Sequence, residues 1–175
     1  TITLSIILIT ILCGIILRIY NLNYENFWFD EILTFYISEP DISFEETKLR
    51  YNAIESIPIF YYLIIQFLHE IIGYYPEVSR YFSLILGVLS IFTVGYLTKQ
   101  ISKNNSYILA IYLVSFNIYL IAYSQEARVY IFTFFLVTLS LIYYFRLYSS
   151  LGNQNFNLLF FNLFQILSFL SHPLT

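Results

Sequence analysis

The sequence predicts an all-α integral membrane protein, a multi-span helical bundle, and three observations support this. Of the 175 residues, 59% are hydrophobic and only 11% are charged, whereas soluble domains carry about 25% charged residues. The mean hydropathy is +0.72. Apolar stretches recur along the chain with nearly the roughly 20 residues that a membrane-spanning helix needs. A soluble domain of this size could not bury so much apolar surface, but a bilayer solvates it.

Five apolar stretches are predicted to span the membrane: residues 2–20, 81–97, 107–123, 129–148 and 156–170. The first is longer than a signal-peptide core, and no small-residue cleavage site follows it. A long polar loop, residues 21–77, separates the first two spans. Within it, Ser43 lies three residues before Glu46, which is a helix-start pattern for a helix over about 41–51. A second loop helix is predicted over about 58–72. We expect both to lie along the membrane surface.

The stretch 58–72 could instead cross the membrane, and the positive charges decide between the alternatives. Positive residues prefer cytoplasmic loops. A surface helix places Lys99 and Lys103 inside, and it places the loop 21–77 and the turn 124–128 together outside. A spanning helix would put both lysines outside and separate the two polar segments. The sequence therefore favours the surface position.

The first polar cluster is the pair Asp30 and Glu31, within Phe27-Trp28-Phe29-Asp30-Glu31. Apolar neighbours raise the pKa of a carboxylate and a nearby cation lowers it. Such a carboxylate is suited to accept a proton from a hydroxyl group. The alternative is an interfacial aromatic belt with solvated acids.

The second cluster is the segment Ser124-Gln125-Glu126-Ala127-Arg128, which interrupts a long apolar region. Tight turns favour Gly, Asn, Asp and Pro, and none is present. Ionisable residues near a membrane often mark ligand paths, and an arginine can hold a phosphate in bidentate fashion. Gln125, Glu126 and Arg128 are therefore candidate ligand-binding residues, and a plain interhelical loop is the alternative.

Three isolated residues are weaker candidates. Arg80 precedes the second span on the outer face, where a snorkelling arginine is the alternative. Arg18 lies near the outer end of the first span, against the positive-inside trend, which predicts a partner such as Asp30 or Glu126. His172 follows the fifth span, and a lone histidine there is more often a hydrogen-bonded surface residue.

No cofactor, metal site or nucleic-acid partner is predicted. No His and Cys residues have metal-site spacing, and no basic run indicates nucleic acid. His69 and Glu70 are expected on the solvated face of the helix at 58–72.

The order of these motifs resembles a known family. Trp28-Phe29-Asp30-Glu31 follows the first span, and Pro58-Ile59-Phe60-Tyr61-Tyr62, Arg80 and Tyr-Ser-Gln-Glu-Ala-Arg-x-Tyr at 123–130 follow in turn. The pattern is similar to the dolichyl-phosphate-mannose–protein mannosyltransferase-like group of GT-C membrane glycosyltransferases, which includes the aminoarabinose transferases of lipid A. The resemblance covers essentially the whole chain.

The resemblance implies transfer of a sugar from a polyprenyl-phosphate donor to a lipid, glycan or protein acceptor outside the cytoplasm. It implies a GT-C bundle with juxtamembrane helices in the first outer loop. Asp30 would be the general base, and Glu31 would support it. Glu126, Gln125 and Arg128 would line the donor site, with Arg128 and Arg80 near the lipid phosphate.

The chain also departs from the family pattern. Relatives often carry His-Pro-Pro where this chain has Ser56-Ile57-Pro58, and Glu55 is offset from the acidic position at which some aminoarabinose transferases bind a metal. Glu55 is therefore only a possible site residue. Because the chain begins at Thr1 and stops after an apolar stretch, we expect the N-terminal part of a larger enzyme, inactive alone. The Ile- and Asn-rich composition suggests an AT-rich bacterial source, and we expect the protein in the bacterial inner membrane.

Two other functions fit the same residues. In a transporter or channel, Asp30, Glu126 and Arg128 would line a path, and helices broken at Gly or Pro near the membrane midplane would be expected. In a non-catalytic scaffold subunit, replacing Asp30 would leave activity unchanged.

Overall fold

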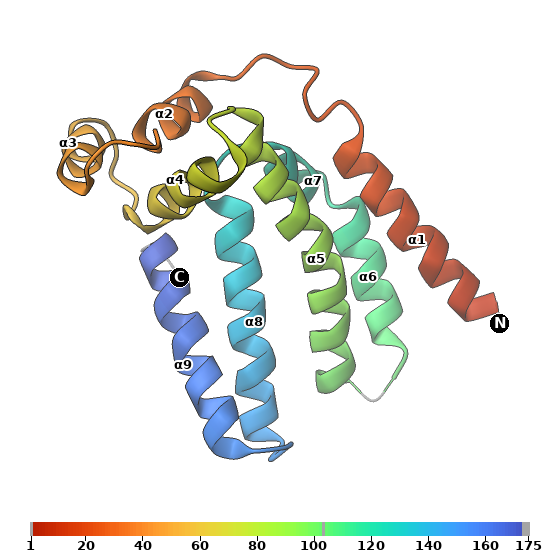
Figure 1. Ribbon diagram of the computed structural model, residues 1–175. Coiled ribbons are helices and arrows are strands. Elements are labelled where there is room, and N and C mark those ends of the chain that lie inside the picture. The colour runs from red at the N-terminus through yellow and green to blue at the C-terminus, as the bar shows by residue number, and fades with distance from the viewer. Residues whose placement is uncertain (1, 103, 173–175) are drawn as a thin grey trace.

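The computed structural model describes residues 2–102 and 104–172, which form nine helices and no strand (Figure 1). The helices are α1 (Ile2–Ile19), α2 (Phe29–Ile37), α3 (Phe44–Ile54), α4 (Phe60–Ile72), α5 (Glu77–Ile101), α6 (Ser106–Phe116), α7 (Ile118–Gln125), α8 (Tyr130–Tyr148) and α9 (Gln154–Ser171). The prediction of an all-helical chain is confirmed.

Two helices, α5 and α8, are long and apolar enough to cross a membrane, and the bent pair α6–α7 would make a third span. The stretch Thr3–Ile19 of α1 is apolar but shorter. Helix α9, with five Asn and Gln side chains, is not among these candidates. Leu4, Ile9 and Leu109 each leave about 60% of their surface exposed, as a lipid-facing helix allows. Spans at α1 and α9 stay predictions.

The predicted span over 107–123 is not one straight helix, because the chain breaks at Asn117. Helix α6 ends at Phe116, and α7 leaves it at an angle of 54°. The Asn117 side chain accepts a hydrogen bond from the Leu120 N–H at 3.0 Å, which caps the new helix. The break starts a second helix that carries the polar segment 124–128 to the end of the bundle.

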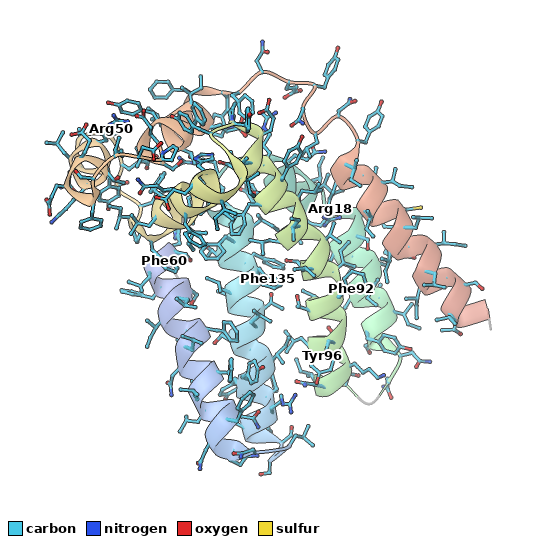
Figure 2. The ribbon with its side chains drawn as sticks, in the orientation of Figure 1. Arg18, Arg50, Phe60, Phe92, Tyr96 and Phe135 are labelled. Carbon is cyan, nitrogen blue, oxygen red and sulfur yellow. The ribbon has the colours of Figure 1, made fainter. Side chains whose placement is uncertain are left out.

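Arg18 satisfies the carbonyl groups that this break releases (Figure 2). Its side chain is fully buried, and it donates to the carbonyls of Val114 at 2.9 Å and Ser115 at 3.1 Å. It also donates to the Gly14 carbonyl of its own helix at 2.9 Å. A cation is stabilised at a helix C-terminus. The predicted partners, Asp30 and Glu126, are therefore wrong, and Arg18 fastens α1 to α6.

The long loop contains three helices, α2, α3 and α4, where two were predicted. Helix α3 begins as expected, with the Ser43 hydroxyl accepting from the Glu46 N–H at 3.3 Å. Figure 1 shows α2, α3 and α4 gathered at one end of the bundle, with the α5–α6 and α8–α9 connections at the other. Lys103, used in the topology argument, lies outside the described residues.

His69 is buried rather than solvated, which corrects the prediction for this face of α4; Glu70 is exposed as expected. The His69 Nδ1–H donates to the Ser38 carbonyl at 2.8 Å. The rings of Phe35 and Tyr74 contact it edge to face. Burial lowers the pKa of His69, although the hydrogen bond to Ser38 opposes this. The neutral imidazole therefore joins α4 to the end of α2.

The largest core cluster joins the loop helices α2 and α4 to α5 and α8. Its members are Ile37, Tyr61, Tyr62, Ile65, Leu86, Val129, Ile131, Phe132 and Leu136. Next to it, Gly87 of α5 lies so close to α7 that an added methyl group would overlap the Ser124 side chain. Small residues allow such close approach between helices. This contact holds the segment 124–128 against the N-terminal half of α5.

Candidate functional site

The first turn of α2 carries two adjacent carboxylates, which have different surroundings. The Glu31 carboxylate accepts a hydrogen bond from the Trp28 backbone N–H at 3.3 Å, which satisfies a free donor at the helix start. The Glu31 side chain is 1% exposed, whereas that of Asp30 is 35% exposed. Successive residues of an α-helix are rotated by about 100°, so neighbours in sequence reach different partners.

Glu31 forms a buried ion pair with Arg80 at the start of α5. The two groups meet in bidentate fashion, with Nε–Oε1 at 2.9 Å and Nη2–Oε2 at 2.6 Å. Arg80 also donates to the carbonyls of Leu22 and Glu25, each at 3.0 Å, and its guanidinium lies over the Phe27 ring. The protein itself thus engages Arg80, the predicted phosphate ligand.

The same Glu31 carboxylate holds the second polar segment. Its Oε1 accepts a hydrogen bond from the Ala127 backbone N–H at 2.7 Å, and this bond is buried. Gln125 is fixed too, because its side-chain amide donates to the Arg18 carbonyl at 3.1 Å and the Tyr20 carbonyl at 2.8 Å, at the end of α1. The segment 124–128 is therefore tied to both α1 and α2.

Arg128 lies between two carboxylates, those of Asp30 and Glu55. Its Nη1 donates to Glu55 Oε1 at 2.8 Å, and its Nη2 lies 3.8 Å from Asp30 Oδ2. Nη1 also approaches the Asp30 carbonyl at 3.4 Å. Burial lowers the pKa of Arg128, but the hydrogen bond to Glu55 and the charge of Asp30 more than compensate, so the pKa lies above its usual value. Arg128 is permanently charged.

One donor of Arg128 has no protein acceptor. The Nε atom is buried and makes no hydrogen bond within residues 2–102 and 104–172. A buried polar group usually has a partner, so this N–H remains free to donate to a ligand. The structure thus brings together Asp30, Arg128 and Glu55, which the sequence places far apart.

A cavity of about 440 Å³ lies beside the Glu31–Arg80 ion pair, and both residues line it. Its lining residues come from the chain after α1, the first turn of α2, the start of α5 and the end of α7: Asn21, Leu22, Tyr24, Glu25, Asn26, Trp28, Glu31, Arg80, Ala122, Gln125 and Glu126. Asn21 has a φ of 60°, a left-handed conformation that asparagine tolerates after a helix. That turn leads the chain from α1 along the cavity wall.

Glu126 lines this cavity with a half-buried carboxylate that makes no hydrogen bond or ion pair in the described part of the chain. Burial raises its pKa above the ordinary value, and the charge of Glu31 raises it further. Arg128 and Arg80 act in the opposite direction, and Asp30 adds to the rise. The Glu126 carboxylate is therefore more readily protonated than a fully solvated one.

The predicted site residues thus lie in different parts of the structure. Glu31, Arg80, Gln125 and Glu126 border the cavity, while Asp30 and Arg128 are not among its lining residues. Arg18 lies at the α6–α7 break, as described above. His172 lines a different, mostly apolar cavity with Tyr123 and Tyr130.

Sequence reasoning missed the contribution of residues 21–26 to the cavity. Tyr24, Glu25 and Asn26 are among its lining residues. The available signal was the polar run Asn-Leu-Asn-Tyr-Glu-Asn between the apolar first span and Trp28. That run reads as an ordinary linker unless it is known to fold back on α5 and α7.

The described residues contain no group of three or more His, Cys, Asp or Glu side chains placed to hold a metal ion. Comparison with known proteins finds no matching family model, no matching curated protein and no matching solved structure.

Proposed function

We propose that the protein is a membrane glycosyltransferase that moves a sugar from a polyprenyl-phosphate donor to an acceptor hydroxyl on the extracytoplasmic face. The observation that carries the proposal is the meeting of the Asp30 carboxylate and the Arg128 guanidinium, 98 residues apart in sequence. The motifs that resemble the GT-C mannosyltransferase-like group contain both residues, and they meet at the end of an apolar helical bundle.

Asp30 is the general base in this proposal. The acceptor oxygen attacks the anomeric carbon of the donor sugar, and the hydroxyl proton passes to the Asp30 carboxylate. Its partly exposed side chain can reach a ligand, whereas the carboxylate of Glu31 is engaged by Arg80 and Ala127. Glu31 would then be a positioning residue, because it fixes the first turn of α2 on which Asp30 lies. Proton transfer to a positioned base contributes about 10²–10⁴-fold to a rate.

Arg128 stabilises the leaving group. The bond between the anomeric carbon and the phosphate oxygen breaks, and its electron pair leaves with the phosphate as an anion. A preorganised cation aimed at that developing charge lowers the barrier. Glu55 holds the guanidinium by one nitrogen, and the buried Nε still has a hydrogen to donate to a phosphate oxygen. Arg80 takes a structural role here.

A lipid-linked donor suits the bundle. Two helices are long and apolar enough to cross a membrane, and in Figure 1 the loop helices lie at the end of α5, α8 and α9. A polyprenyl chain would stay in the bilayer while its phosphate reaches the polar end. On this proposal the protein lies in the bacterial inner membrane, the acceptor is a lipid, glycan or protein, and no cofactor is needed.

The deciding experiment compares transfer by the wild-type protein and its Asp30→Asn variant, in membranes supplied with polyprenyl-phosphate sugars. We expect Asp30→Asn to lower the transfer rate by about 10²–10⁴-fold. Glu70→Gln is the matched control, since Glu70 is an exposed carboxylate on α4 outside the site. Equal transfer by the wild type and Asp30→Asn would remove Asp30 as the base and favour a scaffold role.

A transporter is the second candidate, and the break between α6 and α7 favours it. Transporters build binding sites at discontinuous helices whose free backbone groups face a cavity. Here, however, Arg18 occupies the carbonyls of Val114 and Ser115, and Ser115 is fully buried. Uptake of a solute into vesicles that contain the protein, together with no sugar transfer from a polyprenyl-phosphate donor, would favour the transporter.

A further inference from the structure

The end of the bundle opposite the loop helices carries positive charge and no carboxylate. All eleven Asp and Glu residues lie at positions 25–77 or at position 126. Figure 1 shows these segments at the end where α2, α3 and α4 gather, away from the α5–α6 and α8–α9 connections. Lys99 and Arg146 lie in the last turns of α5 and α8, which lead into those connections. A cation at this end therefore has no acidic side chain nearby.

We propose that a groove between α5 and α8 at this end binds the headgroup of an anionic phospholipid, with Arg146 as the phosphate ligand. The groove has a volume of about 310 Å³. Its lining includes Phe92 and Tyr96 of α5 (labelled in Figure 2), and Leu139, Ile142, Tyr143 and Arg146 of α8. Basic pockets between membrane helices are typical binding sites for such headgroups. This site is separate from Asp30 and Arg128 and does not depend on sugar transfer.

Arg146 differs from the other arginines because it has no carboxylate or carbonyl acceptor in the described part of the chain. Its guanidinium makes one long hydrogen bond there, from Nη1 to the Tyr96 hydroxyl at 3.4 Å, and its buried Nε makes none. The other four donate to backbone carbonyls or to glutamates: Arg18, Arg50, Arg80 and Arg128. An unpaired cation is costly within a membrane, so an anionic ligand would stabilise it.

The Arg146 guanidinium is held against the groove. The turn between α8 and α9 passes close to it, since a Cβ atom added to Gly152 would lie 3.2 Å from Nη2. The Leu151 N–H donates to the Arg146 carbonyl at 2.9 Å, which closes this turn on the end of α8. A snorkelling arginine extends its charged head into water, whereas the Nε of Arg146 is buried. That N–H is therefore placed to meet a ligand in the groove.

The rest of the groove suits the acyl part of a lipid. Leu139 lies seven residues before Arg146 on α8, which at the rise of an α-helix places it about 10 Å further from the end of the bundle. Phe92 and Tyr96 are each 47% exposed, so the groove opens at the apolar surface of the bundle. An acyl chain can follow this apolar wall into the bilayer, whereas a free phosphate would leave it uncovered.

Two tyrosines lie beside the guanidinium. The Tyr96 hydroxyl accepts from Arg146, so its own O–H can donate to a phosphate oxygen. The Tyr143 ring stacks on Phe160 and Phe164 of α9, and the guanidinium lies 5.9 Å from its centroid. Hydrogen bonds from a guanidinium to a phosphate are short and strong. A phosphodiester carries a single negative charge and thus matches this one unpaired cation.

The test titrates the full chain, purified in a neutral detergent, with short-chain lipids. The salt concentration is about 0.15 M, at which charges more than about 8 Å apart are largely screened. The probes are dioctanoyl phosphatidylglycerol, dioctanoyl phosphatidylcholine and inorganic phosphate. Native mass spectrometry counts the bound lipids, and the shift in thermal midpoint gives the apparent affinity. Neither measurement needs a sugar donor.

We expect saturable binding of phosphatidylglycerol, and no saturable binding of phosphatidylcholine or phosphate. Arg146→Gln should weaken the apparent affinity about tenfold, through the loss of a charged donor. Lys99→Gln is the matched control and should leave the affinity nearly unchanged, since Lys99 is an exposed cation at the same end that is not among the lining residues. Tyr96→Phe removes only a hydroxyl and should weaken binding about threefold, which keeps the test decisive if Arg146→Gln does not fold.

Four results would overturn the proposal. Equal affinity for phosphatidylglycerol and phosphatidylcholine would mean that the groove is only apolar. Equal losses in Arg146→Gln and Lys99→Gln would mean a diffuse attraction of anionic lipid to this end of the protein. Binding of inorganic phosphate as tight as that of the lipid would mean an anion site without a lipid. Unchanged affinity in Arg146→Gln, or in Tyr96→Phe where the first variant does not fold, would remove the proposed phosphate ligand.

Discussion

Asp30 and Glu31 are neighbours in sequence, yet the regions on the two sides of them differ in kind. On the Glu31 side, a fully buried carboxylate meets Arg80 at 2.6 Å and also accepts from the Ala127 N–H. On the Asp30 side, a partly exposed carboxylate lies 3.8 Å from Arg128, which keeps an unused buried donor. Both sides contain arginine and carboxylate, but only the first is saturated by protein contacts.

The difference teaches how to separate structural from functional ionisable groups. A buried ion pair holds a fold when every strong donor and acceptor is used, and breaking it leaves an uncompensated charge. A looser pair with exposed acceptors and an unused donor can exchange partners with a ligand. By this criterion Glu31 and Arg80 hold the fold, whereas Asp30 and Arg128 can exchange partners with a ligand, as the proposed mechanism requires.

The largest expected effect comes from breaking the saturated side. Glu31→Gln should lower the free energy of unfolding in detergent by about 3–5 kcal/mol, because it leaves the buried Arg80 without a counter-charge. Asp30→Asn should lower it by less than about 1 kcal/mol, because that ion pair is long and its carboxylate is partly exposed. Denaturant unfolding followed by circular dichroism measures both.

A double variant sharpens the same test. Glu31→Gln combined with Arg80→Leu removes both charges, so it should be more stable than Glu31→Gln alone. If Glu31→Gln and Asp30→Asn lowered stability equally, the distinction between the two sides would have no energetic basis.

A smaller effect is expected at Arg18, which is buried like Arg80 but has carbonyl partners. Arg18→Leu leaves the carbonyls of Val114 and Ser115 without their side-chain donor. We expect a loss of about 2–3 kcal/mol in the same unfolding measurement, the cost of unsatisfied buried acceptors.

Arg18→Lys is the informative partner variant, since a lysine carries the charge but lacks the planar fork that reaches two carbonyls. Its stability should fall between those of Arg18→Leu and the wild type. A fully stable Arg18→Leu variant would mean that the α6–α7 break does not depend on this arginine.

Most of the helices could be predicted from sequence, because long apolar runs and a serine cap are local signals. The break at Asn117 could not, since no Gly or Pro marks it and Arg18, the donor that satisfies it, lies 97 residues from Ser115. Helix α2 was missed because nine residues rich in aromatics are too short for a periodic pattern.

The sequence singled out the members of the candidate site but did not predict which of them pair. Asp30, Arg128, Glu31 and Arg80 were all identified from their motifs. Which carboxylate meets which arginine depends on the rotation between successive helix residues and on how α2 packs against the segment 124–128. Those are tertiary properties, so the sequence could not assign Arg80 to Glu31 or bring Glu55 to Arg128.

The smallest expected effect concerns Glu126, which links the two sides because it lies near both Glu31 and Arg128. Burial raises its pKa in the folded protein, and the charge of Glu31 adds to this. An acid whose pKa is raised in the folded state stabilises the fold at pH values below its unfolded pKa, which is near 4.5. That stabilisation is lost as the pH rises through the folded pKa.

Glu126→Gln removes this titration, so the thermal midpoint of the variant should rise relative to that of the wild type as pH increases from about 4 to 7. Glu70→Gln should show no such trend. If the wild type and Glu126→Gln kept a constant difference over this range, Glu126 would have the same pKa folded and unfolded, and its carboxylate would not be held in a partly desolvated cavity between the two arginines.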